Sequence, residues 1–176
     1  MPEVSNLSNR YEIITDSPFN YYFITDNNVL FVAYFSQTPG YFPGTQFDND
    51  VISFTFEPIG KIGETKKLTR GERFDLLSMP DERIKPTIQY ILIEAMRKSP
   101  EKSIHFICEG IDQKEQMRNR LFGLWHSEVI RNGDLRVTKY DANLANLGIG
   151  SIFVADDNPH HHVIRDNFLA LSDLNK

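Results

Sequence analysis

The sequence from 103 to 126 reads SIHFICEGIDQKEQMRNRLFGLWH, and this stretch decides the fold. Its opening run, SIHFIC, is mostly apolar, which predicts a strand buried within a sheet. Asp112 and Glu115 have the spacing of a capping box, which predicts a helix from about 113 to 125. The stretch also holds the sole cysteine and the sole tryptophan of the chain. A strand, a short acidic loop and a capped helix are therefore expected over this stretch.

The predicted helix carries apolar residues at helical spacing. These lie three or four positions apart and comprise Met117, Leu121, and Leu124 or Trp125. Such a row predicts a stripe buried against the sheet, with Arg118 and Asn119 facing elsewhere. We expect Phe122 and Trp125 to be mostly buried and to hold the helix to the sheet, with Cys108 in the core beneath them.

The single cysteine limits the chemistry available to the chain. It excludes an internal disulfide and any zinc site built on paired cysteines. In an apolar strand a cysteine ordinarily packs as a small hydrophobic residue. His105 lies three positions from Cys108 and hence on the opposite face of the strand, where it is badly placed to act as a base. We therefore expect Cys108 to be a core residue.

Upstream, the sequence predicts a meander of strands and then a helix. Strands are indicated by aromatic and β-branched composition or by alternation at 11–15, 20–25, 29–36 and 51–57. The run at 29–36 is apolar on both faces, which is typical of a central strand. A helical apolar repeat spans 84–96, and Pro86 is expected to lie near its first turn or to kink the helix there. Between them, 58–80 contains glycines and a charge run, and is expected to be an irregular insert with at most a short element at 74–77.

Downstream, Asn132-Gly133 is the strongest hairpin signal in the chain. It predicts a turn that joins a short piece at 128–131 to a strand at 135–140. A loop at 142–148 and a strand at 149–155 should follow. A last helix is expected to start at Pro159 and to bury these residues: Val163 or Ile164, Phe168, Leu171 and Leu174.

These elements predict one fold class. Hairpins at the start imply antiparallel pairing, while the helix between 51–57 and 103–108 is long enough for a parallel crossover. We expect a single α+β domain over 1–176, with a mixed, mostly antiparallel sheet, helices packed on it, and the irregular insert at 58–80.

Charge and hydropathy bound the partners. The net charge is −5 and the pI is about 5.5, so the chain lacks the basic footprint of a nucleic-acid-binding protein. The best basic patch, made of Lys66, Lys67, Arg70 and Arg73, is more typical of a solvated loop. No apolar run is long enough to span a bilayer, and the first residues lack the pattern of a signal peptide. We expect a cytoplasmic protein that binds neither nucleic acid nor membrane.

Motifs for cofactors and metals are weak. The triplet at 160–162 is all histidine and follows Asp156 and Asp157, but adjacent helical residues point in different directions, so the three cannot bind one ion together. Asp157 with His160 or His161 could bind one only if a distant ligand joined them. Gly60 and Gly63 form a G-x-x-G without the remainder of a P-loop. Nucleotide-binding, nucleophile-elbow and zinc-protease motifs are not found in the sequence. We expect no metal and no cofactor, and the sequence names no catalytic residues.

The candidate ligand-binding residues lie in the deciding stretch. Glu109 and Asp112 come at the carboxyl end of a strand and the start of a helix, where ligands tend to bind in open sheets. Arg118 and Arg120 on the helix can pair with them or with an anionic ligand. The alternative is that Asp112 only caps the helix and the arginines form surface ion pairs, each contributing up to about 1 kcal/mol.

The run FICEGIDQKEQMRNRLFGLW, preceded by YYFITDNNVLFVAYF, resembles a family of uncharacterised bacterial proteins, a domain of unknown function. That family shows an aromatic hairpin, a strand ending near Cys-Asp/Glu and a helix of the R-x-R-x-F-x-x-W kind. The matching positions here are Cys108, Glu109, Arg118, Arg120, Phe122 and Trp125. The resemblance implies no activity.

The order of elements also resembles the Gcn5-type N-acetyltransferase fold. That fold binds the acetyl-CoA pyrophosphate on a loop and helix start of the form [RQ]-x-x-G-x-[GA]. The corresponding place here runs from Arg83 to Ile88, and Pro86 and Ile88 stand where that motif has small residues. Proline also lacks the N–H that a phosphate would need. The resemblance therefore implies the fold without its usual cofactor site.

Two functions remain open. The first is a small soluble bacterial binding or interaction domain without catalytic residues, whose partner is a protein or a small molecule. Tyr41, Phe42 and Phe47 in a Gly/Pro loop are candidate docking residues for it. The alternative is a divergent acyl-CoA-dependent N-acyltransferase. Whether the protein is an enzyme is left open by the sequence.

Overall fold

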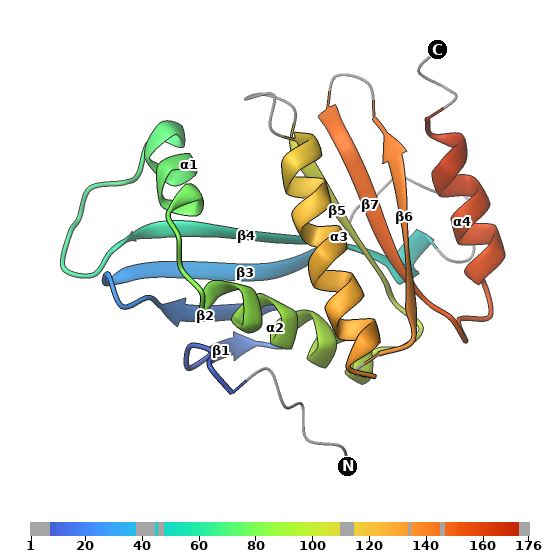
Figure 1. The fold of residues 1–176 in the computed structure, drawn as a ribbon, viewed down its shortest axis with the longest axis horizontal. Helices are drawn as coiled ribbons and strands as arrows, with labels where there is room; N and C mark the ends of the chain where they lie inside the picture. Colours follow the sequence, from blue (N-terminus) through green and yellow to red (C-terminus); the bar gives the residue numbers. More distant parts are fainter. Residues whose placement is uncertain are drawn as a thin grey trace. The chain divides into compact units, whose positions relative to one another are not determined.

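A computed structural model of the protein describes residues 8–37, 45, 48–109, 115–133, 135–144 and 147–172. Over these residues the chain forms seven strands and four α-helices (Figure 1). The strands follow the order β1-β2-β3-β4-β5-β7-β6 and are mostly antiparallel. The predicted α+β class with a mixed, mostly antiparallel sheet is confirmed.

The chain divides into two compact units. One comprises residues 1–35 and 54–92, and the other comprises 36–53 and 93–176. Strand β4 (Val51–Lys61) and helix α2 (Ile84–Lys98) each continue from one unit into the other. The expectation of a single domain is not tested by this division and stays a prediction.

The first unit is built on an aromatic meander. Strands β1 (Ile14–Ser17), β2 (Asn20–Ile24) and β3 (Val29–Gln37) pair antiparallel in sequence, and β4 follows β3 in the order. The rings of Phe23 and Phe31, directly opposite each other, stack at 5.2 Å between centroids. Asn28 has a φ of 58°, so this asparagine supplies the left-handed turn residue of the β2–β3 hairpin. Strands near those expected at 20–25 and 29–36 are confirmed.

Tyr11, expected to open the first strand, lies before it and is a core residue. Its backbone N–H donates to Thr87 Oγ1 at 2.9 Å, and its hydroxyl donates to Asp81 Oδ2 at 2.8 Å. These bonds tie the segment ahead of β1 to the region around the start of α2. Because a hydroxyl and a carboxylate take up its polar groups, Tyr11 can be buried outside a sheet.

The insert at 58–80 is more regular than predicted. Strand β4 continues to Lys61, and α1 forms a helix over Arg70–Ser78. Thr69 and Glu72 make a full capping box, in which Thr69 N–H donates to Glu72 Oε2 at 2.7 Å and Glu72 N–H donates to Thr69 Oγ1 at 3.3 Å. The T-x-x-E start signal lies within the run of lysines and arginines, whose composition is also typical of a solvated loop.

The second unit contains the parallel crossover. Strand β5 (Ser103–Glu109) pairs in parallel with only the first residues of β4, from Val51 opposite Ser103 to Ser53 opposite His105. Strand β7 (Gly148–Ala155) lies antiparallel between β5 and β6 (Val137–Asn143). The predicted crossover between 51–57 and 103–108 is therefore confirmed, and β6 ends the strand order.

Helices α3 (Glu115–Arg131) and α4 (His161–Ala170) pack on opposite faces of β5, β7 and β6. Alternate residues of β5 show this directly. Phe106 contacts Phe122 of α3 at 4.6 Å between ring centroids, whereas His105 contacts Phe168 of α4 at 5.8 Å. Cys108 is buried and shares its face with Phe106, so its expected place in the core and its separation from His105 are confirmed.

The Asn132-Gly133 hairpin prediction is wrong. Residues 128–131 form the last turn of α3, and Asn132-Gly133 ends the helix. Gly133 has a φ of 72°, and its N–H donates to Ile130 O at 3.0 Å. Positive φ suits the residue after a helix as well as a tight hairpin, so the dipeptide alone does not separate the two. The strand that follows starts at Val137 and runs to Asn143, beyond the predicted 140.

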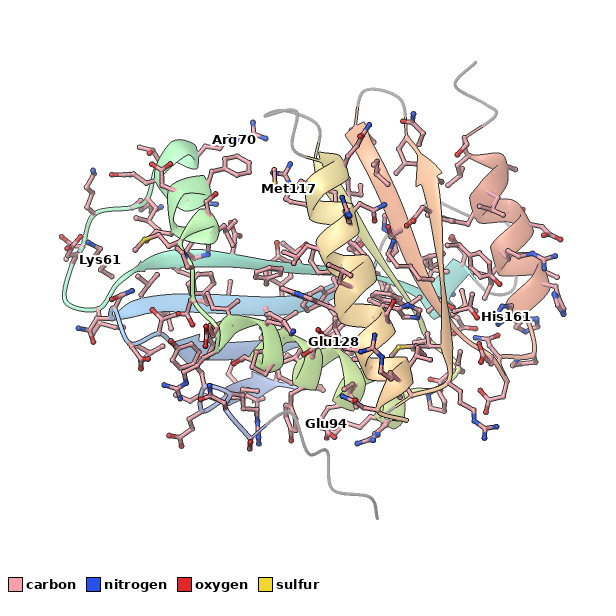
Figure 2. All side chains as sticks on the ribbon, in the orientation of Figure 1. Lys61, Arg70, Glu94, Met117, Glu128 and His161 are labelled. Carbon is pink, nitrogen blue, oxygen red and sulfur yellow. The ribbon has the colours of Figure 1, made fainter. Side chains whose placement is uncertain are left out.

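The predicted buried stripe of α3 is also wrong in part. Met117, labelled near the start of α3 in Figure 2, is 64% exposed, while Leu121 and Leu124 are 44% and 57% exposed. The buried face instead carries Trp125 and Val129, each 9% exposed. Helical spacing fits both rows, so packing against the sheet decided the rotation of the helix. The predicted burial of Trp125 is confirmed, and Phe122, half-buried, contacts both its ring and that of Phe106.

On the opposite face, α4 completes an apolar core. The helix begins at His161, just after the predicted Pro159, and Ile164 and Phe168 are fully buried while Val163 is exposed. Leu174 lies outside the described residues. A Cβ at Gly150 would lie 2.5 Å from Leu144 Cδ1, so any larger residue there would force this leucine to shift from its place on β7. The core residues of this face are Val51, Ala142, Leu144, Ile152, Val154, Ile164 and Phe168.

Candidate functional site

The structure describes only part of the predicted ligand site. Glu109 is the last residue of β5 and pairs with Gly148, but its side chain and all of Asp112 lie outside what the structure describes. Arg118 is half-buried on α3, and Arg120 is exposed. The charge of Arg118 acts on the Cys108 thiol, so these two side chains share a region. A site made of all four residues stays a prediction.

The structure instead reveals a polar cluster between α3 and the sheet, made of Asn119, Lys139, Asp141 and Ser151. Lys139 Nζ donates to Asn119 Oδ1 at 2.8 Å and also forms an ion pair with Asp141. Ser151 Oγ lies 2.5 Å from Asp141 Oδ1 and 3.0 Å from Asn119 Oδ1. A hydroxyl has one proton, and the shorter distance directs it to the carboxylate. Asn119, expected to face away from the sheet, therefore faces it.

Charge compensation explains how this cluster exists beside the core. The Lys139 side chain is 8% exposed, and that of Asp141 is 45% exposed. Burial alone would raise the pKa of Asp141, but hydrogen bonds from Lys139 and Ser151 and the charge of Lys139 lower it overall. Asp141 is therefore ionised at neutral pH and balances the ammonium group.

Cys108 lies near the cluster but is not activated by it. Burial raises the pKa of its thiol to about 11, and the charges of Arg118 and Lys139 only partly oppose this. A thiol with this pKa is neutral at pH 7, and nucleophilic cysteines need the thiolate. The geometry therefore supports a core role rather than covalent catalysis.

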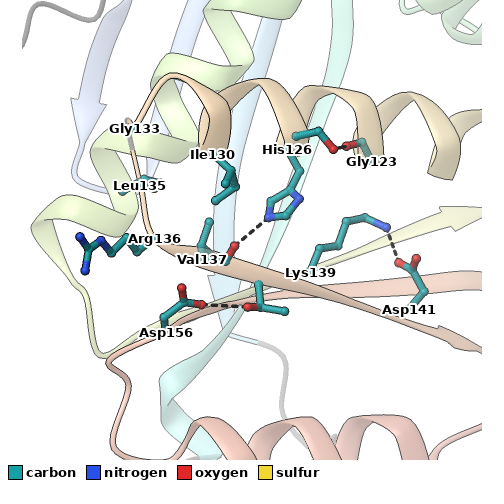
Figure 3. A pocket seen from close by; sticks show the side chains of 12 residues that line it. Gly123, His126, Ile130, Gly133, Leu135, Arg136, Val137, Lys139, Asp141 and Asp156 are labelled. Atoms are coloured by element: carbon teal, nitrogen blue, oxygen red, sulfur yellow. Dashed lines mark hydrogen bonds and ion pairs between the residues drawn. The ribbon is translucent and has the colours of Figure 1, made fainter.

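Next to the polar cluster, a hollow of about 780 Å³ opens between α3 and β6 (Figure 3). Residues of α3, of β6, of the connection between them and of the segment just after β7 line it. From α3 these are Gly123, His126, Ser127 and Ile130; from the connection, Gly133, Leu135 and Arg136; from β6, Val137, Thr138, Lys139 and Asp141; and after β7, Asp156. The lining mixes apolar groups with charges of both signs. Its volume lies within the usual range of ligand sites, roughly 300–1,000 Å³.

His126 fixes one end of this hollow. Its Nε2 lies 2.8 Å from Val137 O, and its ring stacks on Phe153 at 5.5 Å between centroids. Because a carbonyl only accepts, Nε2 must carry the proton. At the opposite side, Thr138 Oγ1 donates to Asp156 Oδ1 at 2.8 Å. The walls of the hollow are thus held by hydrogen bonds of their own.

The backbone of β6 contributes an outer edge to the hollow. Arg136 O accepts from Asp156 N–H, so even-numbered residues direct their backbone groups toward β7. The backbone N–H and C=O groups of odd-numbered residues therefore point away from β7. His126 binds the carbonyl of Val137, and the N–H of Asn143 donates to Ser172 Oγ at 2.9 Å. Between these two ends, Lys139 and Asp141 present outward backbone groups, and across the described strands β6 pairs with β7 alone.

Neither the polar cluster nor the hollow was predicted from the sequence. A signal existed, because Lys139 and Asp141 stand two apart and share one face of a strand. Their partners Asn119 and Ser151 come from a helix and another strand. Only sheet register and helix rotation bring the four together.

Within the histidine triplet, the His161 side chain is held by hydrogen bonds to the protein. His161 Nδ1 lies 2.7 Å from Ala155 O, so it carries the proton, and Tyr140 hydroxyl donates to Nε2 at 2.8 Å. Among the described residues, no three or more His, Cys, Asp or Glu side chains gather where they could hold a metal ion. In that same part of the chain, no helix combines the length and apolarity needed to cross a membrane. Tyr41, Phe42 and Phe47, the predicted docking residues, lie outside it.

The segment that corresponds to a cofactor loop is engaged within the first unit. Arg83 Nη1 donates to Asp26 Oδ1 at 2.9 Å, Nη2 donates to Arg10 O at 3.1 Å, and the guanidinium lies 4.1 Å from the centre of the Tyr11 ring. Pro86 lies in the first turn of α2, as predicted, and Ile88 is fully buried. Arg83 and Ile88 are thus engaged in contacts within the protein, and these contacts account for both residues without a bound phosphate.

The fold and the hollow together define a small α+β domain that presents an edge strand beside a partly polar recess. The chain belongs to a family of unknown function, DUF6169, whose model matches residues 80–170. The match includes every residue that lines the hollow. The resemblance to a domain of unknown function is thereby confirmed. No curated protein and no solved structure matches the chain.

Proposed function

We propose that this protein is a non-catalytic interaction domain that binds an extended peptide segment along β6. The observation that carries the proposal is the hollow of about 780 Å³ beside the outer edge of β6, where Lys139 and Asp141 direct backbone groups outward. A peptide added to a sheet edge gains affinity from main-chain hydrogen bonds and specificity from pockets for alternate side chains. β6 supplies the hydrogen-bonding groups, and the hollow supplies the pocket.

The edge is suited to a regulated partner rather than to indiscriminate pairing. Exposed edges are commonly protected by charged residues and by cover from other elements. Here His126 and Ser172 each bind one outward backbone group, at the two ends of β6, and Lys139 and Asp141 carry charges in the middle. An added strand must therefore fit a short window and match two charges, which favours a defined sequence.

A filled hollow tests the proposal. Peptides selected by display of a random nine-residue library on the purified protein are measured by fluorescence anisotropy. Gly123 lines the hollow from α3, and an added Cβ there meets nothing within 4 Å, so Gly123→Phe is chosen to place a ring in the hollow. We expect it to weaken peptide binding about tenfold or more. Gly71→Phe is the matched control, because it too is a helical glycine with no atom within 4 Å of its Cβ, on α1.

Methylation of backbone nitrogens in the selected peptide tests whether the peptide forms main-chain hydrogen bonds with β6. N-methyl groups at alternate peptide positions should abolish binding in one register and be tolerated in the other, because only every second N–H faces a neighbouring strand. A library that yields no binder, or binders indifferent to Gly123→Phe, would refute peptide recognition at β6.

The compartment that fits this proposal is the cytoplasm. Cys108 is a free, buried thiol, and cytosolic proteins ordinarily keep thiols reduced. The net charge of −5 disfavours a nucleic-acid partner. Labelling of the native protein in fractionated cells checks the location.

An acyl-CoA-dependent transferase is the second candidate. Its support is the strand order β1-β2-β3-β4-β5-β7-β6 with a short parallel β4–β5 pair, which follows the element order of the Gcn5-type fold. The engagement of Arg83 and the burial of Ile88 count against a phosphate site at the start of α2. Thermal unfolding with millimolar CoA or acetyl-CoA decides, since a ligand at a hundredfold its Kd adds about 2.7 kcal/mol. An unchanged melting temperature removes this candidate.

A further inference from the structure

The charges on β6 point to one particular strand as its partner. In an antiparallel pair, residues directly opposite each other on one face interact, and opposite charges there stabilise the pair while like charges destabilise it. A strand that complements β6 must place an acidic residue opposite Lys139 and a basic residue opposite Asp141. Because the partner runs in the opposite direction, the residue opposite Asp141 comes first in its sequence. From its amino end, the partner therefore has the pattern basic-x-acidic. The segment Lys139-Tyr140-Asp141 of β6 has this pattern itself.

We propose that the partner of β6 is β6 of a second copy of this chain, paired antiparallel about a two-fold axis through Tyr140. This inference rests on the proposed function, because it uses the same outward backbone groups and names their occupant. It joins the two sheets edge to edge through the second units of two copies. An isologous contact of this kind closes as a dimer and leaves no further β6 edge exposed.

The register follows from charge. The outward backbone groups belong to odd-numbered residues, which must therefore lie opposite odd-numbered residues of the other copy. A two-fold axis through residue 139, 140 or 141 meets this condition. Centring on 139 places lysine opposite lysine, and centring on 141 places aspartate opposite aspartate. Only the pair centred on Tyr140 sets Lys139 of each copy opposite Asp141 of the other. The result is a square of alternating charges, because Lys139 and Asp141 already pair within each chain.

The length of the available edge agrees with this register. Val137 O is bound by His126, and Asn143 N–H is bound by Ser172, at equal distances on either side of Tyr140. Each of these bonds takes one of the two outward groups of its residue, so Lys139 and Asp141 are the residues of β6 whose outward N–H and C=O can both bond to a partner, and this pairing joins them. The hollow lies alongside, since Lys139 and Asp141 are among the residues that line it.

A charge exchange tests the pairing. Sedimentation equilibrium of the full chain at concentrations up to hundreds of micromolar should show a dimer. Lys139→Asp and Asp141→Lys should each weaken the dimer about tenfold or more, because each sets like charges opposite one another twice. Mixing the two variants should restore association, since the acidic strand of one then complements the basic strand of the other.

Lys139 is largely buried, so its replacement can impair folding, and a cysteine pair provides an independent test. In the proposed register the two Tyr140 residues form a non-hydrogen-bonded pair, about 4.5 Å apart between Cα atoms, which lies within disulfide range. Tyr140→Cys in a Cys108→Ser background should form a disulfide-linked dimer on mild oxidation. Thr138→Cys is the matched control, because it lies opposite residue 142 of the partner and far from its own copy.

The outcomes separate this inference from the proposed function. A wild-type monomer throughout the concentration range, or equal cross-linking of Tyr140→Cys and Thr138→Cys, overturns the β6 dimer. Peptide binding that is sensitive to Gly123→Phe would then still stand. A dimer with the expected cross-link, in a protein that selects no peptide, would support the pairing and overturn recognition of other peptides. A dimer indifferent to both charge variants would use another surface, which also overturns the inference.

Discussion

The two faces of β5, β7 and β6 are built from alternate residues of the same strands, yet they differ in chemistry. On the α4 face, Ile152, Ile164 and Phe168 are fully buried and the contacts are almost entirely apolar. On the α3 face, an aromatic half around Phe106 and Trp125 gives way toward β6 to the Asn119, Lys139, Asp141 and Ser151 cluster. The difference indicates that one face stabilises the fold, while the other carries polar groups to the edge where a partner is expected.

The largest effect should come from the α4 face. Phe168→Ala removes a fully buried ring that contacts His105 and lies in the apolar core, so it leaves a cavity in that core. We expect the free energy of unfolding to fall by about 4–5 kcal/mol, measured by urea denaturation. Val163→Ala, on the exposed side of α4, is the control and should change little. Comparable losses for both variants would mean that α4 does not anchor this face.

Trp125→Ala should cost somewhat less, about 3–4 kcal/mol. The ring is 9% exposed and packs with Phe122 at 5.1 Å, but it lies on the face that is only partly apolar. The loss in free energy of unfolding is measured by chemical denaturation. Far-UV circular dichroism follows the unfolding, because the variant lacks the sole tryptophan and therefore its fluorescence. A cost well above that of Phe168→Ala would reverse the ranking of the two faces.

The α4 face should also determine how stability responds to acid. Burial lowers the pKa of His105 from its usual 6.5 to about 4, so the folded protein keeps this imidazole neutral. Below pH 6.5 the unfolded chain takes up the proton and the folded chain does not. Stability contributed by neutral His105 is therefore complete above pH 6.5 and is lost as the pH falls toward 4, by about 3 kcal/mol.

His105→Gln checks this assignment, because glutamine does not titrate. Its free energy of unfolding, measured by urea at intervals from pH 7 to pH 4, should fall less steeply than that of the wild type. Parallel profiles for the two proteins would show that the acid sensitivity arises at another residue.

On the α3 face, Ser151→Ala tests the polar cluster. The hydroxyl is fully buried and donates to Asp141, so its loss should cost about 1–2 kcal/mol. It should also raise the pKa of Asp141, since the hydrogen bond from Ser151 helps to lower it. Carboxyl NMR titration follows the second effect. A carboxylate whose pKa does not move would show that Lys139 alone holds its charge.

The smallest effects are expected at Arg118 and Arg120. Arg120 is exposed and Arg118 is half-buried, so alanine at either position should cost below about 1 kcal/mol. Urea denaturation of both arginine variants and of Trp125→Ala ranks the three losses in the free energy of unfolding. A larger cost than that of Trp125→Ala would mean that the arginines anchor a buried polar site, and Glu109 and Asp112 would then return as its ligands.

Much of the fold was predictable from local patterns. The strand at 103–108, the helix over 84–96 and the strand at 149–155 appear as β5, α2 and β7, because apolar periodicity and turn residues act within a few positions of one another. Boundaries were predicted less well. The charge run at 66–73 concealed α1, and Asn132-Gly133 fits a helix end as well as a hairpin.

The sequence by itself determined the α+β class, the crossover between β4 and β5, the core position of Cys108 and the burial of Trp125. Only the tertiary structure decided which apolar row of α3 meets the sheet, and hence that Met117 and Leu124 are exposed. It also decided that Asn119, Lys139, Asp141 and Ser151 meet, and that β6 lies at an edge beside a hollow. The physical reason is range: periodicity is set by near neighbours, whereas helix rotation, strand order and the meeting of distant polar groups depend on packing that no local pattern records.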